Sequence, residues 1–184
     1  MKKVFVFLAN GFEEVEALTP VDVIRRAGAE VITVSVENSI EVCGAHNIKV
    51  LADALFDEMD FQEGNLFVLP GGMPGAENLK KHLGLNKLLK SQQAKGKYLA
   101  AICAAPMVLG NLNLLDNKKA TCYPGFEKYL GKAVFTGMPF ETDGNIITGK
   151  GIGTAMEFSL ELVKILFGVE KRDALAARMM VVYK

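Results

Sequence analysis

The stretch AAICAAP, residues 100–106, places one cysteine among alanines, after an apolar run and before a predicted helix. In this position the sulfur of Cys103 lies near the unpaired N–H groups at the start of that helix. These groups and the helix dipole favour the thiolate, which is the nucleophilic form of cysteine. Alternatively, Cys103 is a small buried hydrophobe, as many free cysteines are. The local sequence alone leaves both interpretations open.

A glycine-rich segment, PGGMPGAEN, follows another apolar run and offers backbone groups to a reactive centre. Gly72 would let the backbone approach a ligand closely and donate its N–H group to an oxyanion. The alternative is that the glycines only form a turn. The fingerprint G-x-G-x-x-G is absent after the first predicted strand, where the chain reads NGFE, so we reject a dinucleotide site.

Three carboxyl groups, from Glu13, Glu14 and Glu16, lie at the start of the first predicted helix. We expect at least one to be an exposed acid that complements the helix dipole. Another would face Cys103. A charged carboxylate there opposes the thiolate, whereas a protonated carboxyl donates a hydrogen bond to it. A reactive thiolate therefore requires the neutral form of this glutamic acid, with a raised pKa, and the carboxyl and the thiol then titrate as a pair.

Short apolar runs alternate with amphipathic segments along the chain. This alternation predicts one α/β domain over residues 1–184, with a mostly parallel sheet covered by helices on both faces. Strands are expected at 2–9, 30–36, 65–70 and 98–103, as a pair within 40–51, and as short strands in KATCYP, AVFT and NIITG. Later helices are expected at 85–96, 105–115, 153–168 and 171–180. Ligand sites of such sheets lie outside the carboxyl ends of the strands, where the loops that carry the three groups converge.

Two helix starts are less simple. The first helix begins either at Pro20, with Thr19 as its cap, or near Glu14 with a bend at Pro20. Gly28 is expected to end it. In the helix at 153–168, Thr154 and Glu157 have the spacing of a capping box.

Composition excludes several classes of function. The chain has 184 residues with 21 basic and 21 acidic side chains, so no basic surplus indicates nucleic acid or an anionic membrane as a partner. No apolar run approaches the ~18 residues of a membrane span, and we expect a soluble, cytoplasmic protein. Three cysteines without a C-x-x-C motif, and two histidines, argue against a disulfide framework, a structural zinc site or another metal site.

The assembled stretches resemble the ThiJ/PfpI superfamily, specifically its Parkinson-associated (DJ-one) branch. The matching segments are FLANGFEEVEALTPVDVIRRAG, FVLPGGMPGAENL, AAICAAP and GIGTAMEFSLELV, in family order and spacing. The resemblance implies a flavodoxin-like three-layer sandwich, usually a homodimer, without a cofactor. It also implies an oxidisable cysteine of low pKa at Cys103, hydrogen-bonded by Glu16, with N–H groups of Gly72 and Ala104 as oxyanion donors.

One position departs from the family pattern. Many members carry a histidine just before the proline in the segment that reads TCYPGF here, so Tyr123 takes its place. A tyrosine, with a pKa near 10, is a poor base at neutral pH. His46, in the GAHN turn, falls near a position that is often arginine in relatives. Either it lines the site, with the partner subunit as one possible source, or it is an ordinary turn residue.

The remaining residues of interest have structural interpretations. His82 is expected on a helix surface. Cys43 falls in the predicted short hairpin, and Cys122 falls in a predicted strand, where packing is its expected role.

The resemblance implies three functions. The first is a cysteine-dependent glyoxalase, independent of glutathione, or a deglycase, acting on reactive aldehydes such as methylglyoxal or on glycated adducts. The second is a redox sensor or stress chaperone that uses a cysteine sulfinate. The third is a PfpI-like peptidase, which Tyr123 disfavours because that chemistry needs a Cys–His pair.

Overall fold

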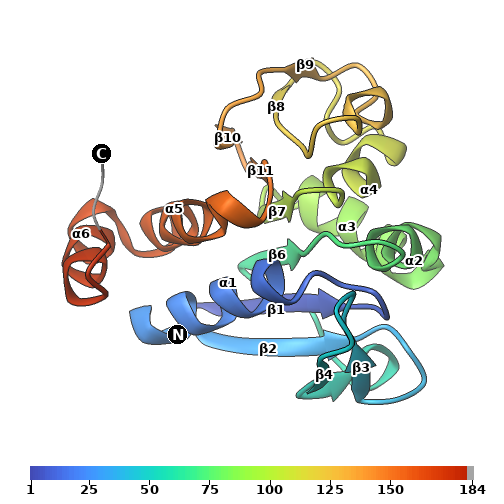
Figure 1. The fold of residues 1–184 in the computed structure, drawn as a ribbon, viewed down its shortest axis with the longest axis horizontal. Coiled ribbons are helices and arrows are strands. Elements are labelled where there is room, and N and C mark those ends of the chain that lie inside the picture. The colour runs from blue at the N-terminus through green and yellow to red at the C-terminus, as the bar shows by residue number, and fades with distance from the viewer. Residues whose placement is uncertain (182–184) are drawn as a thin grey trace.

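The computed structural model describes residues 1–181; the last three residues of the predicted domain, 182–184, lie outside this range. Strands and helices alternate along the chain (Figure 1). The central sheet contains β1 (Lys3–Leu8), β2 (Glu30–Ser35), β5 (Ala54–Leu55), β6 (Leu66–Leu69), β7 (Tyr98–Ile102), β10 (Phe140–Asp143) and β11 (Ile146–Gly149). Two short pairs lie outside it: β3 (Glu41–Cys43) with β4 (Lys49–Leu51), and β8 (Lys119–Ala120) with β9 (Val134–Phe135).

The helices are α1 (Glu14–Ala27), α2 (Gly75–Lys81), α3 (Leu83–Ala94), α4 (Pro106–Asn111), α5 (Ala155–Phe167) and α6 (Val169–Arg178). Short 3₁₀ turns occur at η1 (Phe56–Glu58), η2 (Glu127–Tyr129) and η3 (Ile152–Thr154). Among residues 1–181, no helix has both the length and the apolar character needed to cross a membrane.

The strand order of the sheet fixes where a site can form. The order is β10-β11-β7-β6-β1-β2-β5, and all neighbours are parallel except β10 with β11. The chain therefore moves outward from β1 to β2, and then crosses back to β6 on the other side of β1. This is the flavodoxin-like order, in which ligands bind beside the first strand at the point of reversal. The predicted fold class is confirmed.

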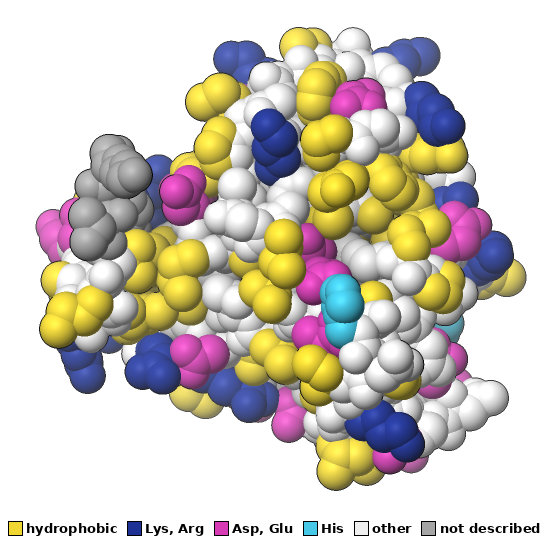
Figure 2. Space-filling view, in the orientation of Figure 1, with side chains coloured by type: hydrophobic (Ala, Val, Ile, Leu, Met, Phe, Trp, Pro, Cys, Tyr) yellow, Lys and Arg dark blue, Asp and Glu magenta, His cyan; other side chains and the backbone are white. Residues whose placement is uncertain are grey.

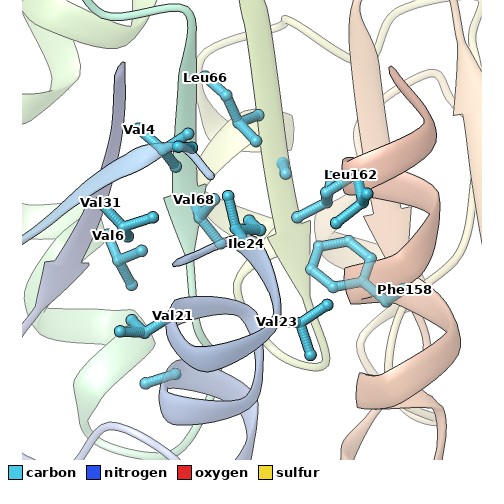
Figure 3. Close-up of a cluster of buried hydrophobic side chains, with 14 of the residues drawn as sticks. Val4, Val6, Val21, Val23, Ile24, Val31, Leu66, Val68, Phe158 and Leu162 are labelled. Carbon is cyan, nitrogen blue, oxygen red and sulfur yellow. The ribbon is translucent and has the colours of Figure 1, made fainter. Parts of the chain in front are cut away.

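Alternate side chains of β1 supply two cores, one on each face of the sheet. Val4, Val6 and Leu8 point to the face that α1, α5 and α6 cover (Figure 3). Phe5 and Phe7 point to the opposite face, under α2, α3 and α4. Because both faces are buried, β1 is apolar from Val4 to Leu8 and holds the loop that follows it in a fixed place.

Several boundaries differ from those expected from sequence. Helix α1 begins at Glu14 and runs through Pro20, so the second alternative is the correct one, and Gly28 ends it with φ of 98°. The capping box at Thr154 does not form. Its hydroxyl instead donates to the carbonyl of Gly151, and η3 precedes α5.

Helix α4 and the segment after it are shorter than predicted. The helix stops at Asn111, because Asn113 adopts a left-handed backbone and the N–H of Leu114 donates to the carbonyl of Leu109.

Strand β8 ends at Ala120, so Cys122 does not lie in a strand. Cys122 is fully buried, as its packing role requires. Strand β10 was not predicted, since only the first residue of its sequence FETD is apolar.

Candidate functional site

Cys103 occupies a sharp turn between β7 and α4. Its φ of 65° is left-handed, which is uncommon for a residue with a side chain. Two backbone hydrogen bonds hold this conformation: the N–H of Cys103 donates to the carbonyl of Gly149 at 2.9 Å, and its carbonyl accepts from the N–H of Tyr123 at 2.8 Å. The small, buried Ala104 and Ala105 follow directly. The turn presents the thiol outside the end of β7, as the sequence predicts.

Glu16 lies in the first turn of α1 and is the carboxyl group that faces Cys103. Only 1% of its surface is exposed. Its Oε2 accepts a hydrogen bond of 3.1 Å from the N–H of Gly71, and its side chain is within hydrogen-bonding reach of the Cys103 thiol. The other oxygen, Oε1, is buried and accepts no bond from the described residues. A buried carboxyl with so few donors is the environment of a neutral acid.

The two acidic groups perturb each other. Burial raises the pKa of Glu16 to about 7, and the hydrogen bond with Cys103 only partly offsets this. Burial also raises the pKa of the Cys103 thiol, and the Glu16 charge raises it further, while N–H groups of Ala104 and Gly72 lower it. The low thiol pKa implied by the resemblance is therefore wrong for an ionised Glu16, because desolvation outweighs the helix N-terminus.

A Cys103 thiolate can nevertheless form without a second negative charge on Glu16. Loss of one proton near pH 7 leaves a single proton between the Glu16 carboxyl and the Cys103 thiol. When Glu16 keeps that proton, the sulfur is a thiolate with N–H donors from Ala104 and Gly72. The pair thus combines a nucleophile with an acid.

Glycines 71 and 72 are required where the loop after β6 meets the other two loops. A Cβ on Gly71 would lie 2.6 Å from Oε2 of Glu16 and 2.7 Å from Cβ of Cys103. Gly72 has φ of 86°, and a Cβ there would overlap the N–H of Glu13. Only glycine allows this approach of backbone to thiol.

A pocket of about 360 Å³ opens above the thiol. Tyr123, Phe126, Met73 and Ile152 form its apolar part. Its polar lining consists of Glu13, Glu16, His46, Gly72, Cys103 and Ala104. Figure 2 shows acidic side chains and a histidine together on this face, between groups of hydrophobic side chains.

The structure settles the position of His46: it lines the pocket within its own chain. Its Nδ1 donates to Oε2 of Glu14 at 2.8 Å, and its backbone N–H donates to Oε1 of Glu14 at 2.8 Å. Burial raises the pKa of Glu14, but hydrogen bonds from His46 and from backbone N–H groups outweigh it and lower the net pKa. Glu13, Glu14 and His46 also have ligand atoms within 4.8 Å of one another, the spacing of a metal site, although both oxygens of Glu14 are already acceptors.

The structure brings together all six residues named from sequence, Cys103, Glu16, Gly72, Ala104, Tyr123 and His46. Their chemical roles stay predictions. The expectation of an exposed acid is wrong: Glu14 is buried, and only 14% of the Glu13 side chain is exposed. The reason is that the β3–β4 hairpin covers this turn of α1. His82 is not on a helix surface; its Nδ1 caps α3 by accepting from the N–H of Leu85.

Sequence reasoning missed three apolar residues of the pocket, Met73, Phe126 and Ile152, and the role of Glu14. Ile152 could have been found from the sequence, since it lies three residues after the carboxyl end of β11, at the same sheet edge as Cys103. Glu14 had none, because its partner His46 is 32 residues away in a hairpin outside the sheet.

Residues 2–165 match the model of the DJ-1/PfpI family. The chain belongs to this family. It is 46% identical over 172 residues to Protein DJ-1 homolog B of Arabidopsis thaliana, covering 92% of this chain but 39% of that protein, so it spans less than half of this relative. It is 28% identical over 166 residues to a deglycase of Pyrococcus abyssi, covering 89% and 99% of the two chains.

The solved structures confirm the fold of this family member. Oxidized DJ-1 of Toxoplasma gondii superimposes with a TM-score of 0.95, at 36% identity and over 100% of both chains.

The buried Glu16 makes stability depend on pH. Its folded pKa of about 7 exceeds the ordinary 4.5, so its contribution is complete below the ordinary value and is lost as pH rises through 7. Glu16→Gln removes the charge and keeps an acceptor for Gly71. We expect the variant to gain about 2 kcal/mol of unfolding free energy over wild type near pH 8, but little near pH 4.

Urea unfolding at the two pH values measures this difference. Glu157→Gln, which changes an exposed acid, is the matched control. An equal effect of Glu16→Gln at both pH values would show that the pKa of Glu16 is the same in the folded and unfolded states.

Proposed function

We propose that this protein is a cofactor-free, cysteine-dependent enzyme acting on 2-oxoaldehydes or on their adducts, of the glyoxalase or deglycase type. The observation that carries the proposal is the convergence of the Cys103 thiol, the Glu16 carboxyl and two N–H groups in one open pocket. The name of the Pyrococcus relative, a deglycase, supports the same class.

The geometry supports a sequence of balanced steps. The Cys103 thiolate adds to the aldehyde carbon and forms a hemithioacetal, whose oxyanion accepts from the N–H groups of Gly72 and Ala104. Glu16 gives its proton to that oxyanion. As a carboxylate it then removes the proton from the former aldehyde carbon and returns it to the neighbouring carbon, while the hydroxyl proton of the hemithioacetal passes to the oxygen on that neighbouring carbon. This transfer leaves a thioester of a 2-hydroxy acid, which water hydrolyses to release the thiol.

Pocket shape agrees with this substrate class. A volume of about 360 Å³ exceeds what a three-carbon aldehyde needs, and the opening leaves room for an adduct on a larger molecule. Tyr123 offers no base for a peptidase mechanism, so that alternative has no support in the pocket.

A redox-sensing role is the second proposal. The hydrogen-bond donors around Cys103 that would stabilise the oxyanion also favour this role. A sulfinate on Cys103 would accept from the N–H groups of Ala104 and Gly72 and from a protonated Glu16. Cys103 is partly exposed, whereas Cys122 is buried. All three cysteines are free thiols, so we also propose a reducing, cytoplasmic setting.

A homodimer is the third proposal. Exposed apolar side chains gather on α1 and on the β3–β4 hairpin, which Glu14 and His46 join. They are Val15, Leu18, Ile48 and Leu51. A continuous apolar surface of this kind is typical of a protein–protein interface.

Lactate formation from methylglyoxal without glutathione tests the enzyme proposal. We expect wild type to form D- or L-lactate and Cys103→Ala to form none, because the first bond is made to the sulfur. Cys43→Ala is the control, since it removes a thiol outside the pocket. Undiminished lactate in a folded Cys103→Ala variant would contradict the mechanism.

Mass spectrometry after mild peroxide treatment tests the sensor. We expect two oxygen atoms to be added at Cys103 before any are added at Cys43 or Cys122, because the N–H groups of Ala104 and Gly72 would stabilise the sulfinate at Cys103. Equal oxidation of all three would contradict this role.

Light scattering after size exclusion tests the dimer. Leu51 is 67% exposed within the apolar surface, and Leu83 is 74% exposed at the start of α3. We expect Leu51→Asp to give a monomer and Leu83→Asp to keep the dimer, since only the first would bury a charge between subunits. A wild-type monomer would overturn the proposal.

A further inference from the structure

The lining of the pocket contains more acidic than basic groups. Glu13, Glu16 and Cys103 are acidic groups in its lining, and His46 is the only basic side chain there among residues 1–181. A substrate that gains negative charge would be repelled by the ionised groups. His46 is therefore the one side chain able to offset that charge.

The imidazole of His46 is fixed in place by a buried acid. Glu14 is only 4% exposed, and its Oε1 accepts from the N–H groups of His46, at 2.8 Å, and Ile48, at 3.4 Å. Its Oε2 accepts from Nδ1 of the same histidine at 2.8 Å. The loop before α1 also binds this hairpin, because the carbonyl of Phe12 accepts from the N–H of Ala45 at 2.8 Å.

This arrangement determines which ring atom can reach a ligand. Nδ1 is occupied by Glu14, while Nε2 has no hydrogen-bond partner in the described part of the chain, and 66% of the side chain is exposed. The hydrogen bond to Glu14, followed by the charges of Glu13 and Glu14, raises the pKa of His46 above its ordinary 6.5. Because Nδ1 already donates to Glu14, protonation of the ring keeps that bond and adds Nε2–H as a free donor.

The chemistry of a 2-oxoaldehyde leaves one oxygen without a donor. The oxygen on the attacked carbon accepts from the N–H groups of Gly72 and Ala104. When Glu16 removes the proton from that carbon, negative charge develops on the second oxygen, on the neighbouring carbon. A cationic N–H donor beside the thiol is what this second oxygen requires.

We propose that His46 is a substrate-binding cation of this pocket, which selects aldehydes that carry a second oxygen on the adjacent carbon, and that Glu14 is the residue that positions it. The role in selection rests on the proposed function. The presence of a cation facing Cys103 does not, and it is tested without turnover.

Alkylation of Cys103 by iodoacetate and by iodoacetamide measures the charge at the thiol, because the reagents differ in charge but form bonds to the same sulfur. We expect His46→Gln to lower the ratio of the two rates about threefold or more, since the anionic reagent loses its attraction. His46→Arg should keep the ratio. His82→Asn, which removes the other histidine and keeps an N-cap acceptor, should not change it.

The pH dependence of that ratio tests the positioning residue. The groups that face the imidazole are Glu13 and Glu14, with Glu16, Cys103 and Tyr123 in the rest of the lining. In wild type the ratio should fall as pH rises through the His46 pKa, and in His46→Arg this fall should disappear. Glu14→Gln should move the fall to lower pH, because it removes the largest cause of the raised pKa.

If Glu14→Gln fails to fold, Glu13→Gln should cause a smaller shift in the same direction. The proposal would be overturned if the ratio of the two alkylation rates were unchanged in His46→Gln. It would also be overturned if that ratio fell at the same pH in wild type and in every folded variant of Glu13 and Glu14.

Turnover then tests selection. With methylglyoxal we expect His46→Gln to lower kcat/KM about tenfold while alkylation by neutral iodoacetamide stays the same, and His46→Arg to restore most of the loss. Unchanged kcat/KM in His46→Gln would overturn the selection role. A wild type without lactate would contradict the proposed function, while the alkylation ratio would still decide whether His46 is the cation.

Discussion

The site depends on one constrained residue, Cys103, whose left-handed backbone turns the chain sharply from β7 into α4. Such a conformation costs of order 1 kcal/mol or more for a residue with a side chain, so the surroundings must impose it. They do so through Gly149 on β11 and through Tyr123, which bond to its N–H and carbonyl groups. Tyr123 therefore contributes to the turn through its backbone, whatever its ring does in the pocket.

The sheet then brings the chemistry to this turn. The loops after β1, β6 and β7 meet at the reversal of strand order, and each supplies one kind of group: a carboxyl, a glycine backbone and a thiol. Burial of Glu16 is unfavourable for a charge and favourable for a neutral acid. Desolvation opposes a charge on either group, so Glu16 keeps its proton to a higher pH than an exposed glutamate does. The proposed mechanism takes both its nucleophile and its acid from this buried pair.

Much of this could be predicted from sequence, for a physical reason. Strands buried on both faces are apolar, and their carboxyl ends share one edge, so Cys103, Gly72 and one of three glutamates could be placed together from local patterns. The choice of Glu16 among the three came from the family resemblance. The pairing of Glu14 with His46 could not, because the hairpin that carries His46 lies outside the sheet and its position depends on tertiary contacts. The balance of pKa effects also required the fold, since burial depends on what packs around a group rather than on its neighbours in sequence.

The proposed mechanism requires that Glu16 and Cys103 share one proton near neutral pH. An NMR titration of the folded protein, with the glutamate carboxyl and cysteine Cβ carbons labelled, measures this sharing. We expect the Glu16 and Cys103 signals to change together near pH 7. A Glu16 signal that titrates alone near the ordinary value of 4.5, with no response at Cys103, would contradict the shared proton.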